Sequence, residues 1–252
     1  HIGDTLDIHC GGQDLIFPHH ENEIAQSECA NGCEFSHYWM HNGYINVDNR
    51  KMSKSLGNFF TVREIGEKYD LQVLRFFMLS AHYRSPLNFS ADLMEASKNA
   101  LDRIVNAVEN LKFLAGSAAD GEMTEAEQKE ADGLAEYEKK FDEAMDDDFN
   151  TADAIAAIFE LVKYANSNVT ADNTKAFINV VKEKIISLSD ILGLIVEKEE
   201  EILDSDIEKL IEERQTARKE KNFARADEIR NLLLEKGIVL KDTREGVKWE
   251  RA

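Results

Sequence analysis

The chain has few residues that interrupt helices. Only two of its 252 residues are proline and 13 are glycine. Because proline breaks helices and glycine weakens them, this scarcity predicts long helices and argues against an all-β sandwich. The sequence contains no run of 18 apolar residues, so no membrane-spanning helix is expected. A basic segment followed by an apolar one is also lacking at the start, so no signal peptide is expected.

Cysteine is scarce as well. The three cysteines are Cys10, Cys29 and Cys33. An odd number of cysteines without a signal peptide indicates reduced thiols and predicts a cytoplasmic location. The spacing of Cys29 and Cys33 is loosely typical of a zinc site, but free thiols beside a helix end are the more common outcome.

Positive charge is in short supply over most of the chain. Lys and Arg total 30 against 49 Asp and Glu, so the formal net charge is -19, which argues against binding to nucleic acid. The excess of acidic residues is distributed unevenly along the chain. The net charge is -6 over residues 1–95, -14 over 96–205 and +1 over 206–252. The last segment includes a basic helix around Arg218. The overall charge therefore does not exclude local binding of phosphate by this segment.

The first sixty residues alternate between short elements. Residues 4–9 alternate polar and apolar, which predicts a strand that runs into a turn at Gly11 and Gly12. A helix is expected over 20–29, a second strand over 44–47, and a turn at Asp48 and Asn49 directly after that strand.

Helical periodicity dominates from about residue 88 onward. Apolar stripes and capping residues predict four helices that begin near residues 90, 124, 150 and 174, the last ending at Gly193. Their polar outer faces predict a helical bundle.

An acidic stretch, Glu197 to Asp206, is the best candidate for a linker. A capping box at Ser205 is expected to open the next helix, which is separated from a further one near Asn222. The remaining residues alternate around Arg244–Gly246, which predicts a closing hairpin.

Two neighbouring histidines precede an acidic helix start. His19 and Glu23 are four residues apart, so on a helix they share a face and can bind one metal ion. Zinc accepts both ligand types but requires two more ligands to complete a tetrahedron. Without further ligands, the alternative is a polar helix start without a metal.

A cationic loop follows the predicted turn. Residues 51–55 read Lys-Met-Ser-Lys-Ser, and Leu-Gly-Asn comes directly after them. Two ammonium groups together with hydroxyl and backbone donors can hold a polyphosphate and stabilise charge on a leaving pyrophosphate. For an isolated pair of lysines a solvated loop is the usual outcome, but the full five-residue string is far more specific.

Residues 51–55 spell the KMSKS signature of class I aminoacyl-tRNA synthetases, and three further strings extend the resemblance. Residues 11–23, 38–41 and 145–151 strongly resemble cysteinyl-tRNA synthetase. The similarity runs along the whole chain. The family's HIGH motif belongs to the first half of its catalytic domain, and residues 1–4 differ from it because the fourth residue is Asp. The chain therefore resembles the C-terminal half of a synthetase.

The resemblance implies a fold class and a domain organisation. The fold class is an α/β remnant, the second half of a class I Rossmann catalytic domain, followed by a mostly α-helical bundle and a small α+β anticodon-binding domain. The expected domains are the catalytic remnant at 1–62, a stem-contact helical segment at 63–115, a DALR-like bundle at 116–198 and the anticodon-recognition domain at 199–252.

The resemblance also implies site residues. His19 and Glu23 match two of four zinc ligands, the other two being cysteines that this chain lacks, so weak or absent zinc binding is expected. His9 matches a residue that lines the cysteine pocket, and Asp14 matches one near the adenylate ribose. Lysines of the KMSKS string match catalytic residues, Lys54 at the ATP phosphates and Lys51 in support of it.

The end of the chain resembles the family's anticodon-binding region. The matching positions are Arg218, Phe223, Asp227 and Asp242. Arginine and aspartate can hydrogen-bond base edges, and an aromatic ring can stack on an unpaired base. Without the resemblance, Phe223 is more simply explained as a residue packed between two helices.

The implied function is a cysteine–tRNA ligase that uses ATP with magnesium and binds cysteine and tRNA(Cys), as a monomer not bound to membranes. The 252-residue chain alone is expected to be inactive, because half of the ATP site belongs to the other half of the family's catalytic domain. Two alternatives stay open: a non-catalytic tRNA-binding protein derived from a synthetase, and a ligase that joins cysteine to an amino-sugar inositol. The latter lacks a long C-terminal tail, so the basic end of this chain favours tRNA.

Overall fold

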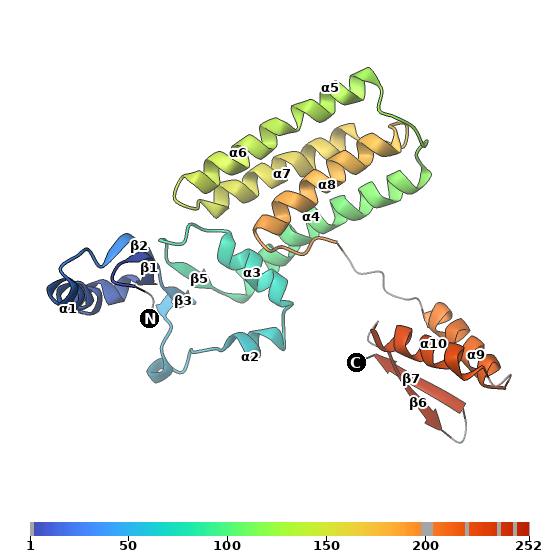
Figure 1. The fold of residues 1–252 in the computed structure, drawn as a ribbon, viewed down its shortest axis with the longest axis horizontal. Helices are drawn as coiled ribbons and strands as arrows, with labels where there is room; N and C mark the ends of the chain where they lie inside the picture. Colours follow the sequence, from blue (N-terminus) through green and yellow to red (C-terminus); the bar gives the residue numbers. More distant parts are fainter. Residues whose placement is uncertain (1–2, 198–203, 220–221, 236–237, 244–245, 252) are drawn as a thin grey trace. The chain divides into compact units, whose positions relative to one another are not determined.

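The chain forms two compact units, residues 1–197 and 198–252, in the computed structural model (Figure 1). The structure describes all residues except a few short segments, namely 1–2, 198–203, 220–221, 236–237, 244–245 and 252. Most of the predicted acidic linker lies outside the described residues. None of the described helices is both long and apolar enough to cross a membrane.

The first unit begins with two parallel strands. β1 (Leu6–Gly12) pairs with β2 (Ser36–Asn42), and α1 (Glu21–Asn31) lies in the connection between them. Parallel neighbours require such a crossover, because a tight turn can only reverse the chain. The predicted turn at Gly11 and Gly12 is wrong, since both glycines lie in β1 opposite β2.

A second small sheet supports the cationic loop. Its order is β4 (Arg50–Lys51), β3 (Ile45–Val47) and β5 (Leu87–Phe89), with β4 antiparallel and β5 parallel to β3. The turn between β3 and β4 is at Asp48 and Asn49, whose φ angles of 47° and 60° are left-handed. Asp and Asn tolerate this region better than other non-glycine residues, which explains the predicted turn.

Two helices lead from the loop to the bundle. α2 (Val62–Gly66) begins with a capping box formed by Thr61 and Glu64, and α3 (Leu71–Leu79) is capped by Asp70. α3 buries three apolar side chains in the core of the bundle: Val73, Phe76 and Phe77.

Five helices form the bundle of the first unit. They are α4 (Ala91–Ser117), α5 (Glu125–Gly133), α6 (Ala135–Asp146), α7 (Thr151–Asn168) and α8 (Lys175–Ile191). Four polar residues accept hydrogen bonds from the first turns of α4, α5, α7 and α8: Ser90, Thr124, Asn150 and Thr174. These caps confirm the predicted starts. The expected second helix is divided at Leu134, which is fully buried.

One carboxylate satisfies the starts of two bundle helices. Glu127 in α5 accepts hydrogen bonds from the backbone N–H groups of Thr124 and Thr174, which cap α5 and α8. Both threonine hydroxyls and the Asn173 amide also donate to it. The side chain is 7% exposed. These donors favour the charged form and lower the pKa of Glu127 from 4.5 to about 2.

The end of α8 is packed tightly against α3. Arg75 donates from Nε to the carbonyl oxygen of Leu192 at 2.7 Å. The next residue, Gly193, has a φ of +64°, and a Cβ there would lie 2.6 Å from Arg75 Nη2. Glycine is therefore required both by the backbone and by the neighbouring guanidinium group.

We expect Gly193→Ala to destabilise the first unit by roughly 1–3 kcal/mol, because it adds backbone strain and displaces Arg75. Urea unfolding followed by circular dichroism measures the change. Gly116→Ala is the matched control, since nothing lies within 4 Å of a Cβ at that position of α4. Equal stability of the two variants would contradict the prediction.

The described part of the second unit contains two helices and a hairpin. α9 (Asp204–Lys219) and α10 (Phe223–Glu235) form the helical part, and β6 (Ile238–Thr243) pairs antiparallel with β7 (Gly246–Arg251). Its core consists of Ile211, Ile229, Leu233 and Ile238. The hairpin and the helix break near Asn222 are confirmed, whereas α9 begins at Asp204 and so includes the predicted cap at Ser205.

Candidate functional site

One group of three side chains among the described residues is arranged to bind a metal ion. His9 lies on β1, His20 precedes α1, and Glu23 lies in the first turn of α1. One ligand atom of each lies within 4.8 Å of the others, and His9 Nε2 is 2.7 Å from Glu23 Oε2. Imidazole nitrogen and carboxylate oxygen suit zinc, and three protein ligands leave a fourth position for a substrate. These residues therefore fit a zinc ion.

A histidine outside this group, His41, orients His20. The Nδ1 atom of His20 lies 2.8 Å from Nε2 of His41, which leaves Nε2 of His20 for a metal. Burial, and then the nearby His20 and His9, lowers the pKa of His41, so a neutral His41 can accept this hydrogen bond. A Cβ at Gly11 would lie 2.6 Å from the His20 ring. Glycine at this position of β1 thus gives the ring its space.

Aromatic rings enclose one side of the group. The His9 ring meets Trp39 edge to face at a centroid distance of 4.8 Å and lies 5.3 Å from Phe35. Strand register produces this contact, because His9 is opposite Trp39 and Gly11 is opposite His41. Sequence reasoning missed His20, Trp39 and His41 as site residues. The only available signal was that all three lie in strings that resemble the synthetase.

The structure does not bring the other metal candidates into this group. His19 is exposed, and its assignment as a ligand stays a prediction. All three cysteines are free, and no described cysteine belongs to a group of three ligands. The Sγ atom of Cys33 instead lies 3.5 Å from the Thr5 hydroxyl, next to β1.

Side-chain hydrogen bonds hold the cationic loop closed at its base. Asn58 accepts from the backbone N–H of Ser53 at 2.9 Å and donates to the carbonyl oxygen of Lys51 at 3.2 Å. The Nζ atom of Lys51 lies 5.5 Å from the centroid of the Tyr44 ring. Lys54 begins a short 3-10 helix, Lys54–Leu56, and its side chain lies outside the described part of the structure.

The predicted ribose contact lies directly after β1. Asp14 is exposed in a single turn of helix, Gln13–Leu15. A Cβ at Gly12 would clash with Asp14 Oδ1, so the carboxylate folds back over the strand end. The neighbouring Gln13 donates to the carbonyl oxygen of Arg84 at 3.0 Å, which fixes this turn to the segment before β5.

Three of the predicted anticodon residues are exposed in the second unit. Arg218 lies on α9, and Phe223 and Asp227 lie one turn apart on α10. Phe223 is 61% exposed, so the alternative that it packs between the helices is wrong. Asp242 lies on β6, and its side chain is outside the described part. Their assignment to anticodon recognition stays a prediction.

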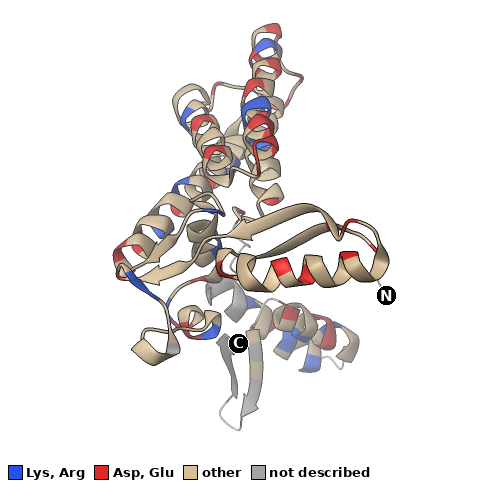
Figure 2. Ribbon diagram, turned by 90° about the vertical axis from the view of Figure 1, so that its left-hand side faces the viewer, with Lys and Arg blue, Asp and Glu red and all other residues tan. Residues whose placement is uncertain are grey.

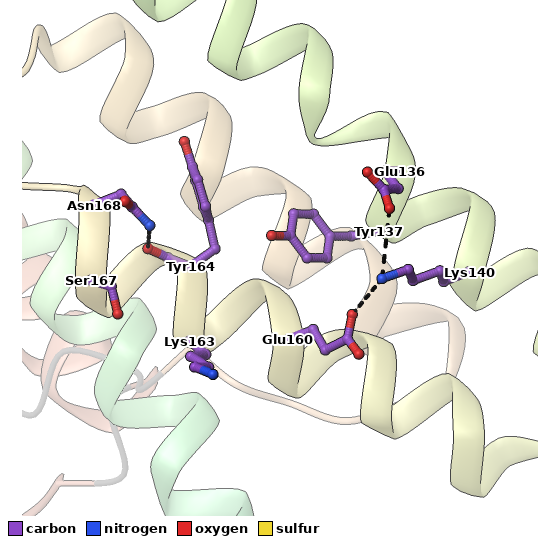
Figure 3. Close-up of a pocket in the computed structure, with 8 residues that line it drawn as sticks. All are labelled: Glu136, Tyr137, Lys140, Glu160, Lys163, Tyr164, Ser167 and Asn168. Carbon is purple, nitrogen blue, oxygen red and sulfur yellow. Dashed lines mark hydrogen bonds and ion pairs between the residues drawn. The ribbon is translucent and has the colours of Figure 1, made fainter.

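Acidic groups are prominent on the first unit, and Figure 2 shows them on α1 and along the bundle. A surface hollow of about 410 Å³ between α6 and α7 includes two tyrosines and two lysines (Figure 3). Its Lys140 is paired with Glu160 at 2.7 Å. Tyr164 donates to Glu130 at 2.8 Å, and burial followed by this hydrogen bond raises the pKa of Tyr164. The hollow contains none of the predicted site residues.

Comparison with protein families divides the chain into three consecutive matches. Residues 1–99 match the catalytic domain of class I (C) tRNA synthetases, 140–197 match the DALR domain, and 201–249 match the anticodon-binding domain of cysteinyl-tRNA ligase. These matches and the fold identify part of a class I tRNA synthetase catalytic domain, followed by a DALR domain and an anticodon-binding domain. They confirm the predicted fold class, whereas the boundaries of the four predicted domains stay predictions.

Curated relatives specify the family. The chain is 67% identical to a cysteine–tRNA ligase of Lachnospira eligens, 62% identical to one of Lachnoclostridium phytofermentans and 52% identical to one of Clostridioides difficile. Each alignment covers all of this chain and 53–55% of the relative. The chain belongs to the cysteinyl-tRNA synthetase family, and it spans about half the length of the curated relatives it matches.

A solved structure supports the fold alone. The ternary complex of Agrobacterium radiobacter K84 agnB2 LeuRS with tRNA and LeuAMS aligns with a TM-score of 0.55 and 18% identity. The alignment covers 75% of this chain and 28% of that one.

Proposed function

We propose that the protein containing this chain is a cysteine–tRNA ligase. It activates cysteine with ATP and magnesium and then transfers the cysteinyl group to tRNA(Cys). The observation that carries this proposal is the identity of 52–67% with cysteine–tRNA ligases over the whole chain. The catalytic, DALR and anticodon-binding matches in chain order support the same activity.

The metal-binding group suits the choice of cysteine as substrate. His9, His20 and Glu23 would hold zinc, and Nδ1 of His20 is oriented by His41. Bound zinc supplies a ligand position that accepts a thiolate far better than the hydroxyl of serine, so binding alone discriminates the two amino acids. The sequence instead predicted His19 as the histidine ligand, so His19 and His20 are alternative assignments for this position.

The cationic loop provides charge for the phosphates. Lys54 would contact the ATP phosphates, Lys51 would support it, and Asp14 would bind the ribose. Positioning and electrostatic stabilisation are the main contributions available to such groups. The Asn58 hydrogen bonds to Ser53 and Lys51 hold the base of this loop.

The second unit would recognise tRNA through few contacts. Phe223 offers an exposed ring for stacking, and Arg218, Asp227 and Asp242 would read base edges. The overall charge of -19 opposes non-specific RNA binding, so specificity rests on these groups. A monomeric state and a cytoplasmic location remain predictions of the same proposal. The two alternatives drawn from the sequence are not supported by the comparisons.

Cysteine-dependent exchange of pyrophosphate into ATP tests the proposal in the protein that contains this chain. We expect Lys54→Ala to lower kcat of the exchange roughly 100-fold, because the charge on the leaving pyrophosphate loses its partner. Lys68→Ala, outside the loop, is the control. Exchange that depends on an amino acid other than cysteine, or that tolerates Lys54→Ala, would overturn the proposal.

A further inference from the structure

The segment 82–85, between α3 and β5, is attached to the catalytic part of the chain by its backbone. The carbonyl oxygen of Tyr83 accepts from the N–H of Gly43 at 2.8 Å, directly after β2. The carbonyl oxygen of Arg84 accepts from the Gln13 side chain at 3.0 Å, next to Asp14. A Cβ at Gly43 would lie 2.6 Å from the Ser85 carbonyl group, so the two backbones are in close contact.

Side chains of the same segment bind the bundle at a single residue. Asp148, between α6 and α7, accepts from the Tyr83 hydroxyl at 2.8 Å and pairs with Arg84 Nη2 at 2.7 Å. The Arg84 Nε atom also donates to the Tyr83 hydroxyl at 3.1 Å. His82 Nε2 lies 3.6 Å from the same carboxylate. Three side chains from this short segment thus contact the Asp148 carboxylate.

The turn that presents Asp148 has an unusual backbone. Asp148 and Phe149 have φ angles of 57° and 55°, in the left-handed region that non-glycine residues rarely adopt. Backbone N–H groups of Phe149 and Asn150 close the turn onto α6. The first residue of α7, Thr151, donates to the carbonyl oxygen of Leu79 at 2.7 Å. Strain of this kind persists where the surroundings fix it and is a pointer to function.

We propose that Asp148 is a positioning residue that keeps the bundle in register with the catalytic segment during transfer to tRNA. The inference rests on the proposed function. Loss of the Asp148 carboxylate leaves the contacts of the backbone of residues 82–85 with Gly43 and Gln13 intact. The residues proposed to activate cysteine therefore keep their geometry. The bundle loses its ion pair with Arg84, so tRNA held by the C-terminal parts of the chain is presented less accurately. A displacement of about 1 Å is enough to slow a reaction greatly.

Asp148→Asn tests the proposal in the protein that contains this chain, because asparagine tolerates the left-handed backbone, keeps the size of the side chain and replaces the charged carboxylate with a neutral amide. We expect kcat of tRNA cysteinylation to fall about tenfold, while kcat and KM of cysteine-dependent pyrophosphate exchange change less than twofold. Tyr83→Phe alone should slow transfer about threefold. Added to Asp148→Asn, the same change should slow transfer by less than about a further threefold. Glu160→Gln, which removes the equally short pair with Lys140 inside the bundle, is the matched control (Figure 3).

The outcomes separate this inference from the function beneath it. Absence of cysteine-dependent exchange in the unaltered protein would overturn the proposed function, and this inference with it. Normal exchange together with unchanged transfer in Asp148→Asn would overturn the inference alone. An equal loss of exchange and transfer would also overturn it, because that result indicates general destabilisation.

Discussion

Glu23→Gln is expected to abolish most zinc binding and to lower kcat/KM for cysteine activation roughly 100-fold or more. Glu23 is the anionic member of the group with His9 and His20, and an amide is a poor substitute for a carboxylate at zinc. Zinc content of the purified protein and its affinity by titration calorimetry measure the first effect. Pyrophosphate exchange at varied cysteine concentration measures the second.

Two further variants identify the histidine ligands. His20→Ala should lose zinc as Glu23→Gln does, whereas His19→Ala should retain it if the grouping of His9, His20 and Glu23 is the binding geometry. Glu21→Gln, on the same exposed helix start, is the control for a change of charge. Full zinc content in Glu23→Gln would falsify the metal assignment. Loss of zinc in His19→Ala alone would restore the ligand predicted from the sequence.

Glu127→Gln should destabilise the first unit by about 3 kcal/mol near neutral pH. The magnitude follows from the pKa of Glu127, which is lowered from 4.5 to about 2 by donors from two helix starts. An amide keeps the shape but turns an NH₂ group toward donors such as the Thr174 N–H. Urea denaturation at pH 7 measures the loss. Glu125→Gln, on the exposed side of the same first turn, is expected to change stability little.

The same carboxylate gives the effect a defined pH dependence. Because the folded-state pKa is depressed, the stabilisation is fully present above pH 4.5 and is lost as the pH falls toward 2. The difference in stability between the unaltered chain and Glu127→Gln should therefore shrink over this interval. A difference that stays constant from pH 7 to pH 2.5 would contradict the assignment of the stabilisation to the charged form.

Local chemistry made the bundle predictable from the sequence. Thr124 and Glu127 form a capping box that fixes a helix start within four residues, and the structure shows both of its hydrogen bonds. The division of the expected second helix at Leu134 has no such local signal, because it depends on how this side chain is buried among other helices. The parallel pairing of β1 with β2 was missed for a similar reason, since the partners are far apart in the sequence.

The candidate site shows the same limit. Glu23 could be predicted from the sequence, because the spacing of four residues that places two side chains on one helix face is visible in the sequence itself. The contact of His20 with His41, and of His9 with Trp39, depends on strand pairing that spacing does not describe. His9 was assigned to the substrate pocket by resemblance, and the structure adds that it lies within ligand distance of Glu23. The role proposed for Lys51 and Lys54 likewise rests on the whole five-residue string.

The register of β1 against β2 makes the candidate metal site of His9, His20 and Glu23 dependent on correct folding. Side chains alternate between the two faces of a strand, so a slip of one residue would turn His9 away from Trp39 and move Gly11 away from His41. A misaligned sheet would lose the arrangement proposed to bind the ion. Binding of the ion to the correctly paired sheet alone would then shift the population toward that pairing, in proportion to the concentration of free ion.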